Sequence, residues 1–301
     1  MKKVYYIGSN HDGCYYVRCL LPLIANGWDG QRTSVSGSKA SNEQMYAAME
    51  DADVVVFHRP DSKEKVDVIP LLQAQGKKVV VDNDDTYKSN SGAQTKYLTG
   101  DQDAKLKEMN KNIYKACRLA DMVTVSTKFL KREYKTKNKN TIILPNFVDP
   151  LDWDEPLRNT SGKVRIGLVG SVTKYDDYKV IVPLLKKLSA DDKVQLVVFG
   201  LPDPDKDGYR EIAKMYKEEL DFWYSLDIEH QPAVPSPQYM DTLRSLKLDV
   251  MLVPREDSYF NKCKSNIKFL EASMLGIPIV ASGFEDKCSP YQNKMDIKKM
   301  K

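Results

Sequence analysis

Short apolar runs recur along the whole chain, and most are separated by longer segments in which apolar residues follow helical spacing. The runs predict strands at Val4–Ile7, Val54–Phe57, Val79–Val81, Met122–Val125, Ile142–Leu144, Val164–Val169, Leu196–Phe199, Val250–Val253 and Ile277–Ala281. The longer segments predict helices at Tyr15–Asn26, Glu43–Glu50, Lys63–Gln75, Ala104–Ala120, Lys128–Tyr134, Lys179–Ser189, Gly208–Phe222, Pro237–Leu246 and Ser265–Leu275. Because fully apolar strands that alternate with helices are typical of doubly wound parallel sheets, the pattern predicts an α/β fold.

The alternation of strands and helices is interrupted once. After Ile142–Leu144 comes a loop with two prolines, Pro145–Pro150, and then a polar stretch that ends at Lys163. A strand followed by glycine then begins again at Ile166–Ser171, as one does at Tyr5–Ser9. We therefore expect two Rossmann-like domains, residues 1–155 and 156–301, which face a cleft. Ligands of such sheets bind beyond the carboxyl ends of the strands, so the cleft is the expected site.

Composition and charge narrow the functional class. The 301 residues are 42% hydrophobic and 29% charged, and 46 basic against 42 acidic residues give a net charge of +4. This balance does not favour nucleic acid as the main partner. The five cysteines show no C-x-x-C spacing, which indicates a reducing compartment and no zinc site. No signal peptide or membrane-spanning run is visible, so we expect a cytoplasmic protein without an integral membrane segment.

The most informative stretch is the predicted helix after Lys264. Ser265 suits an N-cap, and Gly276 suits the helix stop. On a helical wheel Lys264, Lys268 and Glu271 share one face. Lysines near a helix N-terminus suit a diphosphate, and the carboxylate suits sugar hydroxyls. The alternative is an amphipathic helix with a solvated Lys/Glu face.

A second candidate phosphate site follows the strand that opens the second half. Gly170 allows the backbone to approach an anion closely, Ser171 follows it, and Lys174 and Lys179 add positive charge. The alternative is a polar loop with surface lysines. Val234, in a proline-flanked loop, is a candidate backbone wall for a nucleobase.

The first strand leads into the glycine-containing loop Gly8–Gly13. It is not a dinucleotide fingerprint, because Asn10 replaces the middle glycine, and this disfavours a dehydrogenase. The loop places His11 and Asp12 where an acceptor can be held. The alternative is a hydrated turn.

Polar residues also follow two later strands of the first half. His58 and Arg59 follow Val54–Phe57 and are candidates to contact an acceptor or a phosphate, although a histidine here is often structural. Asp84 and Asp85 lie in the acidic run Asp82–Asp85. Paired aspartates can hold a divalent metal ion, but lysines at the late helix already neutralise a diphosphate. We therefore favour carboxylates that orient an acceptor hydroxyl and assign no metal site.

These features together resemble a known family. Val253-Pro254, the motif Lys264-Ser265-Asn266-x-Lys268-x-x-Glu271-Ala272 and the segment Gly276–Val280 are similar to those of GT-B-fold glycosyltransferases, and most similar to the retaining, nucleotide-sugar-dependent group (family 1/4-like). The resemblance implies that Glu271 binds the donor ribose and that Lys174 and Lys268 bind its diphosphate. It also implies that the Asp82–Asp85 loop faces the acceptor.

The chain departs from that family in two places. A second glutamate is expected eight positions before Glu271, where this chain has Cys263, and Glu256 from a longer loop is a candidate replacement. Family members also continue past Gly283 with a further strand and helices. We therefore expect a C-terminal domain that lacks these last elements.

The expected function is transfer of a sugar from a nucleoside diphosphate sugar to a hydroxyl acceptor, which is a glycan, lipid, protein or modified base. The resemblance implies retention of the anomeric configuration. The expected catalytic residues are Lys268, Lys174, Asp84 and Asp85. The expected donor-binding residues are Gly170, Ser171, Lys264, Ser265, Asn266, Glu271 and Val234. His11, Asp12, His58 and Arg59 are expected on the acceptor side, and no cofactor is required. Two alternatives remain: an enzyme that acts on modified DNA bases, and a non-catalytic protein that binds sugar nucleotides.

Overall fold

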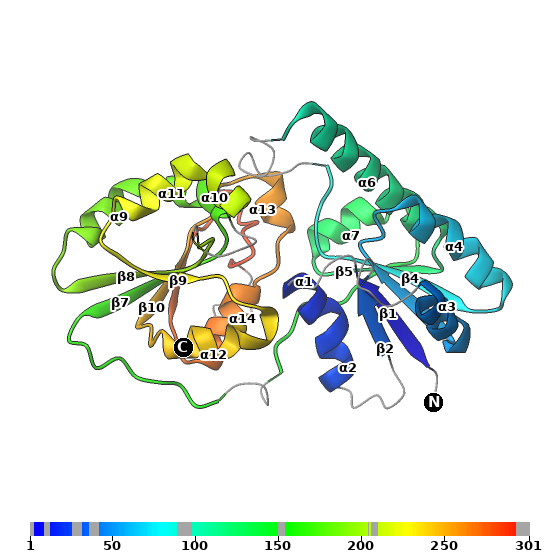
Figure 1. The fold of residues 1–301 in the computed structure, drawn as a ribbon, viewed down its shortest axis with the longest axis horizontal. Helices are drawn as coiled ribbons and strands as arrows, with labels where there is room; N and C mark the ends of the chain where they lie inside the picture. Colours follow the sequence, from blue (N-terminus) through cyan, green and yellow to red (C-terminus); the bar gives the residue numbers. More distant parts are fainter. Residues whose placement is uncertain are drawn as a thin grey trace. The chain divides into compact units, whose positions relative to one another are not determined.

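The computed structural model describes residues 3–8, 13–25, 32–35, 42–88, 98–149, 154–203, 205 and 210–292. The described residues form two compact units. The first contains those up to residue 88, residues 98–149 and the short segment Cys263–Ser265, and the second contains the rest. Both units are parallel α/β structures, as the sequence pattern predicted (Figure 1).

The first unit contains a six-stranded parallel sheet with the order β2-β1-β3-β4-β5-β6. Its strands are β1 (Val4–Gly8), β2 (Arg32–Val35), β3 (Val54–His58), β4 (Lys78–Asn83), β5 (Met122–Val125) and β6 (Thr141–Ile143). Its helices are α1 (Gly13–Tyr15), the π-helical turn η1 (Tyr16–Leu20), α2 (Leu21–Ala25), α3 (Asn42–Asp51), α4 (Lys63–Ala74), α6 (Gly100–Leu119) and α7 (Lys128–Tyr134).

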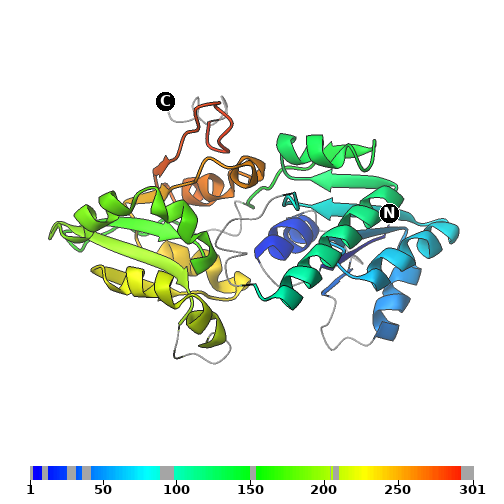
Figure 2. The ribbon, with the colours of Figure 1, turned by 90° about the horizontal axis from the view of Figure 1, so that it is seen from above.

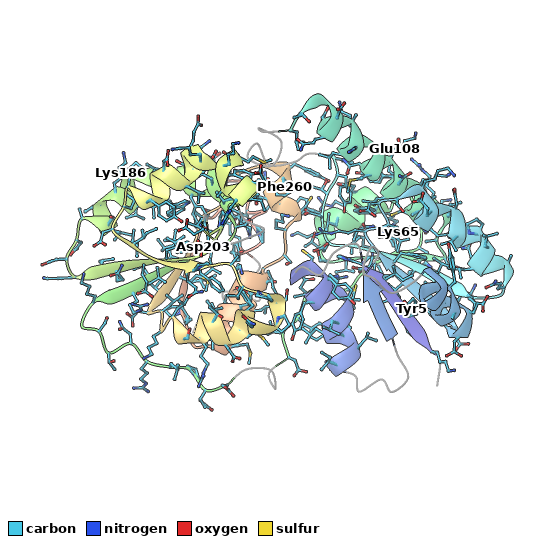
Figure 3. All side chains as sticks on the ribbon, viewed as in Figure 1. Tyr5, Lys65, Glu108, Lys186, Asp203 and Phe260 are labelled. Atoms are coloured by element: carbon cyan, nitrogen blue, oxygen red, sulfur yellow. The ribbon has the colours of Figure 1, made fainter. Side chains whose placement is uncertain are left out.

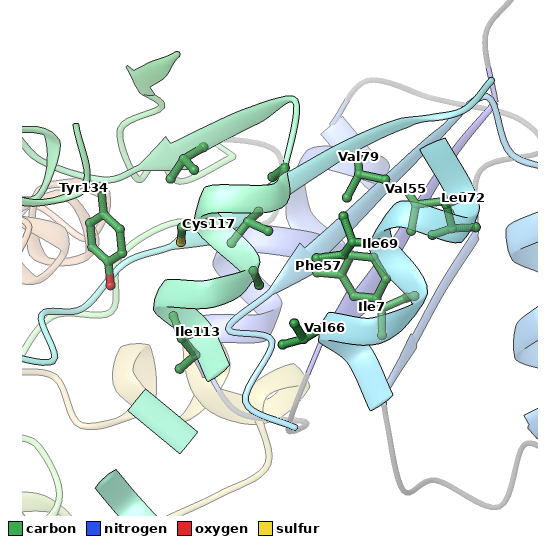
Figure 4. Close-up of a cluster of buried hydrophobic side chains, with 14 of the residues drawn as sticks. Ile7, Val55, Phe57, Val66, Ile69, Leu72, Val79, Ile113, Cys117 and Tyr134 are labelled. Atoms are coloured by element: carbon green, nitrogen blue, oxygen red, sulfur yellow. The ribbon is translucent and has the colours of Figure 1, made fainter. Parts of the chain in front are cut away.

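Both faces of this sheet are covered by helices. On one face Phe57 of β3 and Val79 of β4 share a fully buried cluster with Val66 and Ile69 of α4 and Ile113 of α6 (Figure 4). On the other face, strand residues form a smaller cluster with the helical segment that follows β1. This burial on both faces explains why the strands read as continuous apolar runs.

The helices of the first unit begin where local chemistry predicts. Thr99 and Gln102 form a reciprocal capping box at the start of α6, and Thr127 accepts a hydrogen bond from the Leu130 N–H at the start of α7. Gly76, with φ of +81°, follows α4, in a conformation that favours glycine.

The second unit contains a five-stranded parallel sheet with the order β11-β10-β7-β8-β9. The strands are β7 (Val164–Val169), β8 (Val194–Leu201), β9 (Ile228–Pro232), β10 (Val250–Val253) and β11 (Ile279–Ala281). The helices are η3 (Val172–Lys174), α8 (Tyr175–Lys179), α9 (Val182–Ser189), α10 (Arg210–Met215), α11 (Lys217–Tyr224), η4 (Ser236–Gln238), α12 (Tyr239–Ser245), α13 (Tyr259–Cys263) and α14 (Ile267–Met274).

Helices cover both faces of this second sheet as well. Figure 2 shows the layers of each unit from above. One core cluster lies under α8, α9 and α11 and includes Leu185 and Trp223, and the other lies under α12 and α14 and includes Leu243 and Ala272. Charged residues such as Glu108 of α6 and Lys186 of α9 lie on the exposed surface (Figure 3).

Two strands and two short α-helices were missed by the sequence pattern. Strands β2 and β9 have polar sequences, Arg-Thr-Ser-Val and Ile-Glu-His-Gln-Pro, and both lie at the edge of their sheet. An edge strand is not enclosed on both sides, so its sequence need not be apolar. The missed helices are α8 and α13, which span five residues each.

Within the described residues, no helix is both long enough and apolar enough to cross a membrane. The same residues contain no cluster of three or more histidine, cysteine or acidic side chains suited to a metal ion.

Candidate functional site

The first two turns of α14 carry the lysine and glutamate that the sequence singled out. The Lys268 ammonium lies 2.8 Å from Glu271 Oε2, and the Tyr239 hydroxyl donates to the same oxygen at 2.7 Å. Lys268 Nζ also lies 2.6 Å from the Tyr239 oxygen, so the three groups form a closed triangle. The side chains of Lys268 and Glu271 are only 12% and 11% exposed, so the alternative of a solvated Lys/Glu face is wrong.

Tyr239 completes this triangle because the core holds its ring. It stacks on Phe199 of β8 with ring centroids 5.3 Å apart and an interplanar angle of 19°. Burial, followed by the neighbouring Glu271 carboxylate, raises the pKa of Tyr239 well above its usual value. Tyr239 is therefore a neutral donor to Glu271. No local sequence pattern indicates a role for Tyr239, because its contact with Glu271 spans 32 positions.

The carboxyl ends of β7 and β8 lie in close contact at two glycines. The Gly170 N–H donates to the Phe199 carbonyl at 2.9 Å. Gly200 has φ of +108°, and a Cβ atom on it would lie 2.9 Å from the Gly170 carbonyl oxygen. A Cβ on Gly170 would in turn lie 2.9 Å from Cδ of Lys174. Gly200 therefore requires glycine, whereas a side chain at Gly170 would require the flexible Lys174 side chain, which lies against it, to shift.

The other predicted donor residues of the second unit occupy this region or the neighbouring loop. Ser171 is exposed, and its hydroxyl lies 2.6 Å from that of Thr173. Val234 follows β9 and packs partly buried against the cluster that contains Phe199. Among the described residues, neither forms a hydrogen bond with the Lys268 triangle.

A buried polar network links the segments that follow β7 and β10. Asp177 accepts hydrogen bonds from Arg255 (2.9 Å), from the Asn261 amide (2.7 Å) and from the Glu256 N–H (3.1 Å). Asp177, Arg255 and Asn261 are 8%, 7% and 3% exposed. Beside it, an open hollow of about 460 Å³ is lined by Asp176, Lys179, Val180 and Glu256. The network fixes the backbone at Glu256 but points that side chain to the exposed surface.

The expected N-terminus of α14 is wrong by two residues. The helix begins at Ile267 with Asn266 as N-cap residue, and the predicted capping by Ser265 does not occur. Ser265 instead accepts a hydrogen bond from the Asn146 amide at 2.9 Å. Lys264 lies before the helix and binds both carboxylate oxygens of Asp85 at 2.8 Å. Lys264 and Ser265 both belong to the first unit, whereas α14 belongs to the second.

In the first unit, the residues that follow β3 and β4 form one charged cluster. Arg59 Nε donates to Asp84 at 2.7 Å, and His58 Nε2 lies 3.3 Å from the same oxygen. Arg59 has φ of +51°, an uncommon conformation for a residue other than glycine. Burial alone would raise the pKa of Asp84, but Arg59 and His58 outweigh it and hold the pKa well below its usual range.

Arg18 binds the carboxyl end of β4, and it was not among the residues predicted from the sequence. Its side chain binds both oxygens of Asp82 at 2.9 and 2.5 Å and donates to the Leu144 carbonyl at 2.6 Å and the Asn146 amide oxygen at 2.9 Å. Thr124 also donates to Asp82. Arg18 is 3% exposed and lies in the π-helical turn η1, a local irregularity that is frequent at functional sites. The sequence signal that could have identified Arg18 is a single charged residue in the otherwise apolar helical segment Tyr15–Ala25.

The structure therefore joins the predicted residues in two groups. Lys268 and Glu271 contact each other in the second unit, and His58, Arg59, Asp84, Asp85 and Lys264 form a chain of contacts in the first. His11 and Asp12 lie outside the described residues. The roles of all these residues stay predictions.

Comparison with known proteins gives matches at the level of structure. No protein-family model matches the chain, and no curated protein matches it. HepE of Anabaena in complex with UDP-glucose is similar with a TM-score of 0.58 and 10% identity, over 93% of this chain and 80% of that one. Sucrose-phosphate synthase of Thermosynechococcus elongatus has a TM-score of 0.58 and 14% identity, over 93% and 81%. An alpha-glucosyltransferase (AGT) in complex with UDP has a TM-score of 0.56 and 11% identity, over 99% and 89%. The fold is therefore that of the GT-B glycosyltransferases, as the sequence resemblance predicted.

Proposed function

We propose that this protein is a glycosyltransferase that moves a sugar from a nucleoside diphosphate sugar to a hydroxyl acceptor. The observation that carries the proposal is the buried Lys268–Glu271–Tyr239 triangle at the start of α14, in a GT-B fold. Solved structures with this fold hold UDP or UDP-glucose. Fold alone does not decide function, so the proposal depends on the chemistry of the triangle.

The triangle suits a donor because its charges are already oriented. Both contacts to Glu271 use Oε2, so Oε1 is available to accept hydrogen bonds from ribose hydroxyls without displacement of Lys268 or Tyr239. Lys268 would place positive charge against the diphosphate, and Lys174 beside Gly170 would add to it. Positive charge fixed before the reaction stabilises the departing diphosphate without reorganisation at the moment of transfer.

The remaining assignments extend this proposal. Residues 156–301 would bind the donor and residues 1–155 the acceptor, with Asp84 and Arg59 on the acceptor side. No metal ion would be required, because lysines would neutralise the diphosphate. Retention of the anomeric configuration and the class of acceptor rest on the sequence resemblance and need direct assay.

The experiment measures donor binding and transfer separately. Thermal shift against UDP-, GDP- and ADP-sugars identifies the nucleotide, since a ligand that binds only the native state raises the melting temperature. Release of nucleoside diphosphate with candidate acceptors then measures turnover, and NMR of the product gives its anomeric configuration. We expect Glu271→Gln to raise the donor KM sharply, because the amide offers a weaker acceptor to ribose.

Lys268→Ala tests the catalytic charge. Loss of one such group is expected to lower kcat by about 10²–10³. Lys217→Ala is the matched control, because Lys217 also pairs with a carboxylate on a helix, at Asp221, but its side chain is 72% exposed. Unchanged donor binding and turnover in both site variants would refute the assignment. Binding without turnover against any acceptor would instead support a non-catalytic sugar-nucleotide-binding protein.

A further inference from the structure

The segment of residues 128–139 concentrates the positive charge of the chain. It contains six basic residues and one acidic residue, a net charge of +5, whereas the whole chain carries +4. The basic residues are Lys128, Lys131, Arg132, Lys135, Lys137 and Lys139. We call this set the basic face.

Helix α7 and its C-cap residue, Lys135, present four of these residues on one side. Lys128, Lys131, Arg132 and Lys135 follow the spacing i, i+3, i+4 and i+7, which lines one face of a helix. The opposite side holds Leu130 and Tyr134, both fully buried. The helix is therefore anchored by its apolar side, while Lys128, Arg132 and Lys135 are exposed and Lys131 is half-buried.

The single acidic residue of the segment does not neutralise this surface. Glu133 is 1% exposed and accepts hydrogen bonds from the Thr86 hydroxyl at 2.7 Å and the Tyr114 hydroxyl at 2.6 Å. Its charge thus faces the interior. Among the residues that the structure describes, none of the six cations of the basic face forms an ion pair with a carboxylate.

Exposed lysines of the neighbouring long helix behave differently. On α6, Lys107 pairs with Asp103 at 2.7 Å and Lys111 with Glu108 at 3.3 Å. Lys115 lies 3.7 Å from Asp67 of α4. The absence of carboxylates from the basic face is therefore a local property and not a consequence of a lysine-rich composition.

An apolar edge adjoins the basic face. Strand β6 contacts α7 and lies at the edge of the sheet. Ile142, Ile143 and Leu144 are 41%, 39% and 42% exposed, and only two residues separate them from the basic segment. Lysine and arginine beside exposed aliphatic side chains form a surface that suits the interface of a lipid bilayer.

We propose that the basic face and the β6 edge dock on a membrane surface that contains anionic lipid. Positive charge alone would suit a nucleic acid equally well, but phosphate contacts make no use of exposed isoleucine and leucine. The combination favours a bilayer, where basic residues meet lipid phosphates and aliphatic side chains enter the headgroup region. This inference is independent of the proposed sugar transfer, because binding is measured without substrate.

Vesicle sedimentation tests the charge. The full chain is mixed with vesicles of phosphatidylcholine with or without phosphatidylglycerol, and we expect binding only to the anionic vesicles, with loss of affinity as salt rises. Each basic residue near an anionic surface contributes about fivefold, so the triple reversal K128E/R132E/K135E should weaken binding by at least about a hundredfold. The matched control, K107E/K111E/K115E, changes the net charge equally on α6 and should leave binding within about threefold.

A second pair of variants tests the apolar edge. Ile142→Ser with Ile143→Ser should weaken binding to anionic vesicles by about tenfold, while binding to duplex DNA is measured in parallel. Thermal unfolding confirms that each variant is folded. Equal weakening by the α6 control, no preference for anionic vesicles, or no effect of the serine substitutions would overturn the proposal. DNA binding that is tighter than vesicle binding would assign the basic face to a polyanion instead.

Discussion

Removal of the Asp177 carboxylate should destabilise the second unit strongly. Asp177 accepts three hydrogen bonds, from Arg255, Asn261 and the Glu256 N–H, and it is the only carboxylate paired with Arg255 in the described residues. Asp177→Ala would leave the Arg255 guanidinium without this counter-charge in a site where Arg255 is 7% exposed. Breaking a buried ion pair by removal of one partner costs about 3–5 kcal/mol.

This cost translates into a large shift of the melting temperature. For a unit of this size, 1 kcal/mol corresponds to about 3 °C, so we expect a decrease of about 10–15 °C for Asp177→Ala. Asp177→Asn keeps one acceptor oxygen but loses the charge and turns the other oxygen into an NH2 donor that faces a donor, so it should recover only part of this loss. The control Asp221→Ala removes a pair whose side chains are 61% and 72% exposed, and it should cost under about 1 kcal/mol.

The assay must report on the second unit by itself. Trp223 is fully buried in that unit, 5.0 Å from the ring of Tyr178, which follows Asp177 in the chain. The chain has three tryptophans, so a Trp28→Phe/Trp153→Phe background leaves Trp223 as its single tryptophan fluorophore. Urea unfolding followed by this fluorescence gives the change in free energy.

A double-mutant cycle separates pairing from packing. If Arg255 and Asp177 stabilise the unit as a pair, Asp177→Ala combined with Arg255→Met should cost clearly less than the sum of the two single variants. The reasoning would be refuted by a loss under about 1 kcal/mol for Asp177→Ala. It would also be refuted by additive single losses, because the guanidinium would then not depend on the carboxylate.

Three further predictions concern the strand ends. The pKa of Asp84 is lower in the folded state than in the unfolded state, so as pH falls below about 3.8 the unfolded state takes up a proton first and the stability present at higher pH is lost. Asp84→Asn should flatten this dependence of the free energy of unfolding on pH, measured by denaturant unfolding at a series of acidic pH values. Gly200→Ala should cost about 1–3 kcal/mol in urea unfolding, because it combines positive φ with a Cβ 2.9 Å from the Gly170 carbonyl oxygen, and an unchanged midpoint would contradict the close approach. Arg18→Lys should cost about 2–4 kcal/mol, because an ammonium cannot bind both Asp82 oxygens and the Leu144 carbonyl together; thermal unfolding within 1 °C of the unchanged protein would contradict that role.

Local sequence patterns predicted much of the fold because most strands are enclosed on both faces. Runs such as Val164–Val169 match the observed strand, whereas the polar edge strands β2 and β9 gave no such signal. The Lys268–Glu271 pair was also accessible, because residues three positions apart on a helix are neighbours. Helix ends were less accessible: Ser265 looked like a cap, but Asn146 from elsewhere in the chain binds its hydroxyl.

The rest of the site could not be predicted because its contacts join distant positions. Arg18 and Asp82 are 64 positions apart, and Asp177 and Arg255 are 78 apart. Neither pair follows a helical or strand period, so only the tertiary arrangement of neighbouring strand ends shows them. The same reason applies to Tyr239, whose role depends on the position of Glu271.

The two groups of charged residues differ in what they offer a ligand. Asp84 is bound by Arg59 and His58, and its lowered pKa makes it a weak proton acceptor near neutral pH. An acceptor hydroxyl near Asp84 would compete with both partners for the carboxylate and would not lose its proton to it readily. Glu271, in contrast, keeps Oε1 outside its two hydrogen bonds. The geometry therefore favours Asp84 as a charge that orients an acceptor and not as a base. The contacts that best support the proposed function are those of Lys268, Glu271 and Tyr239 at the start of α14.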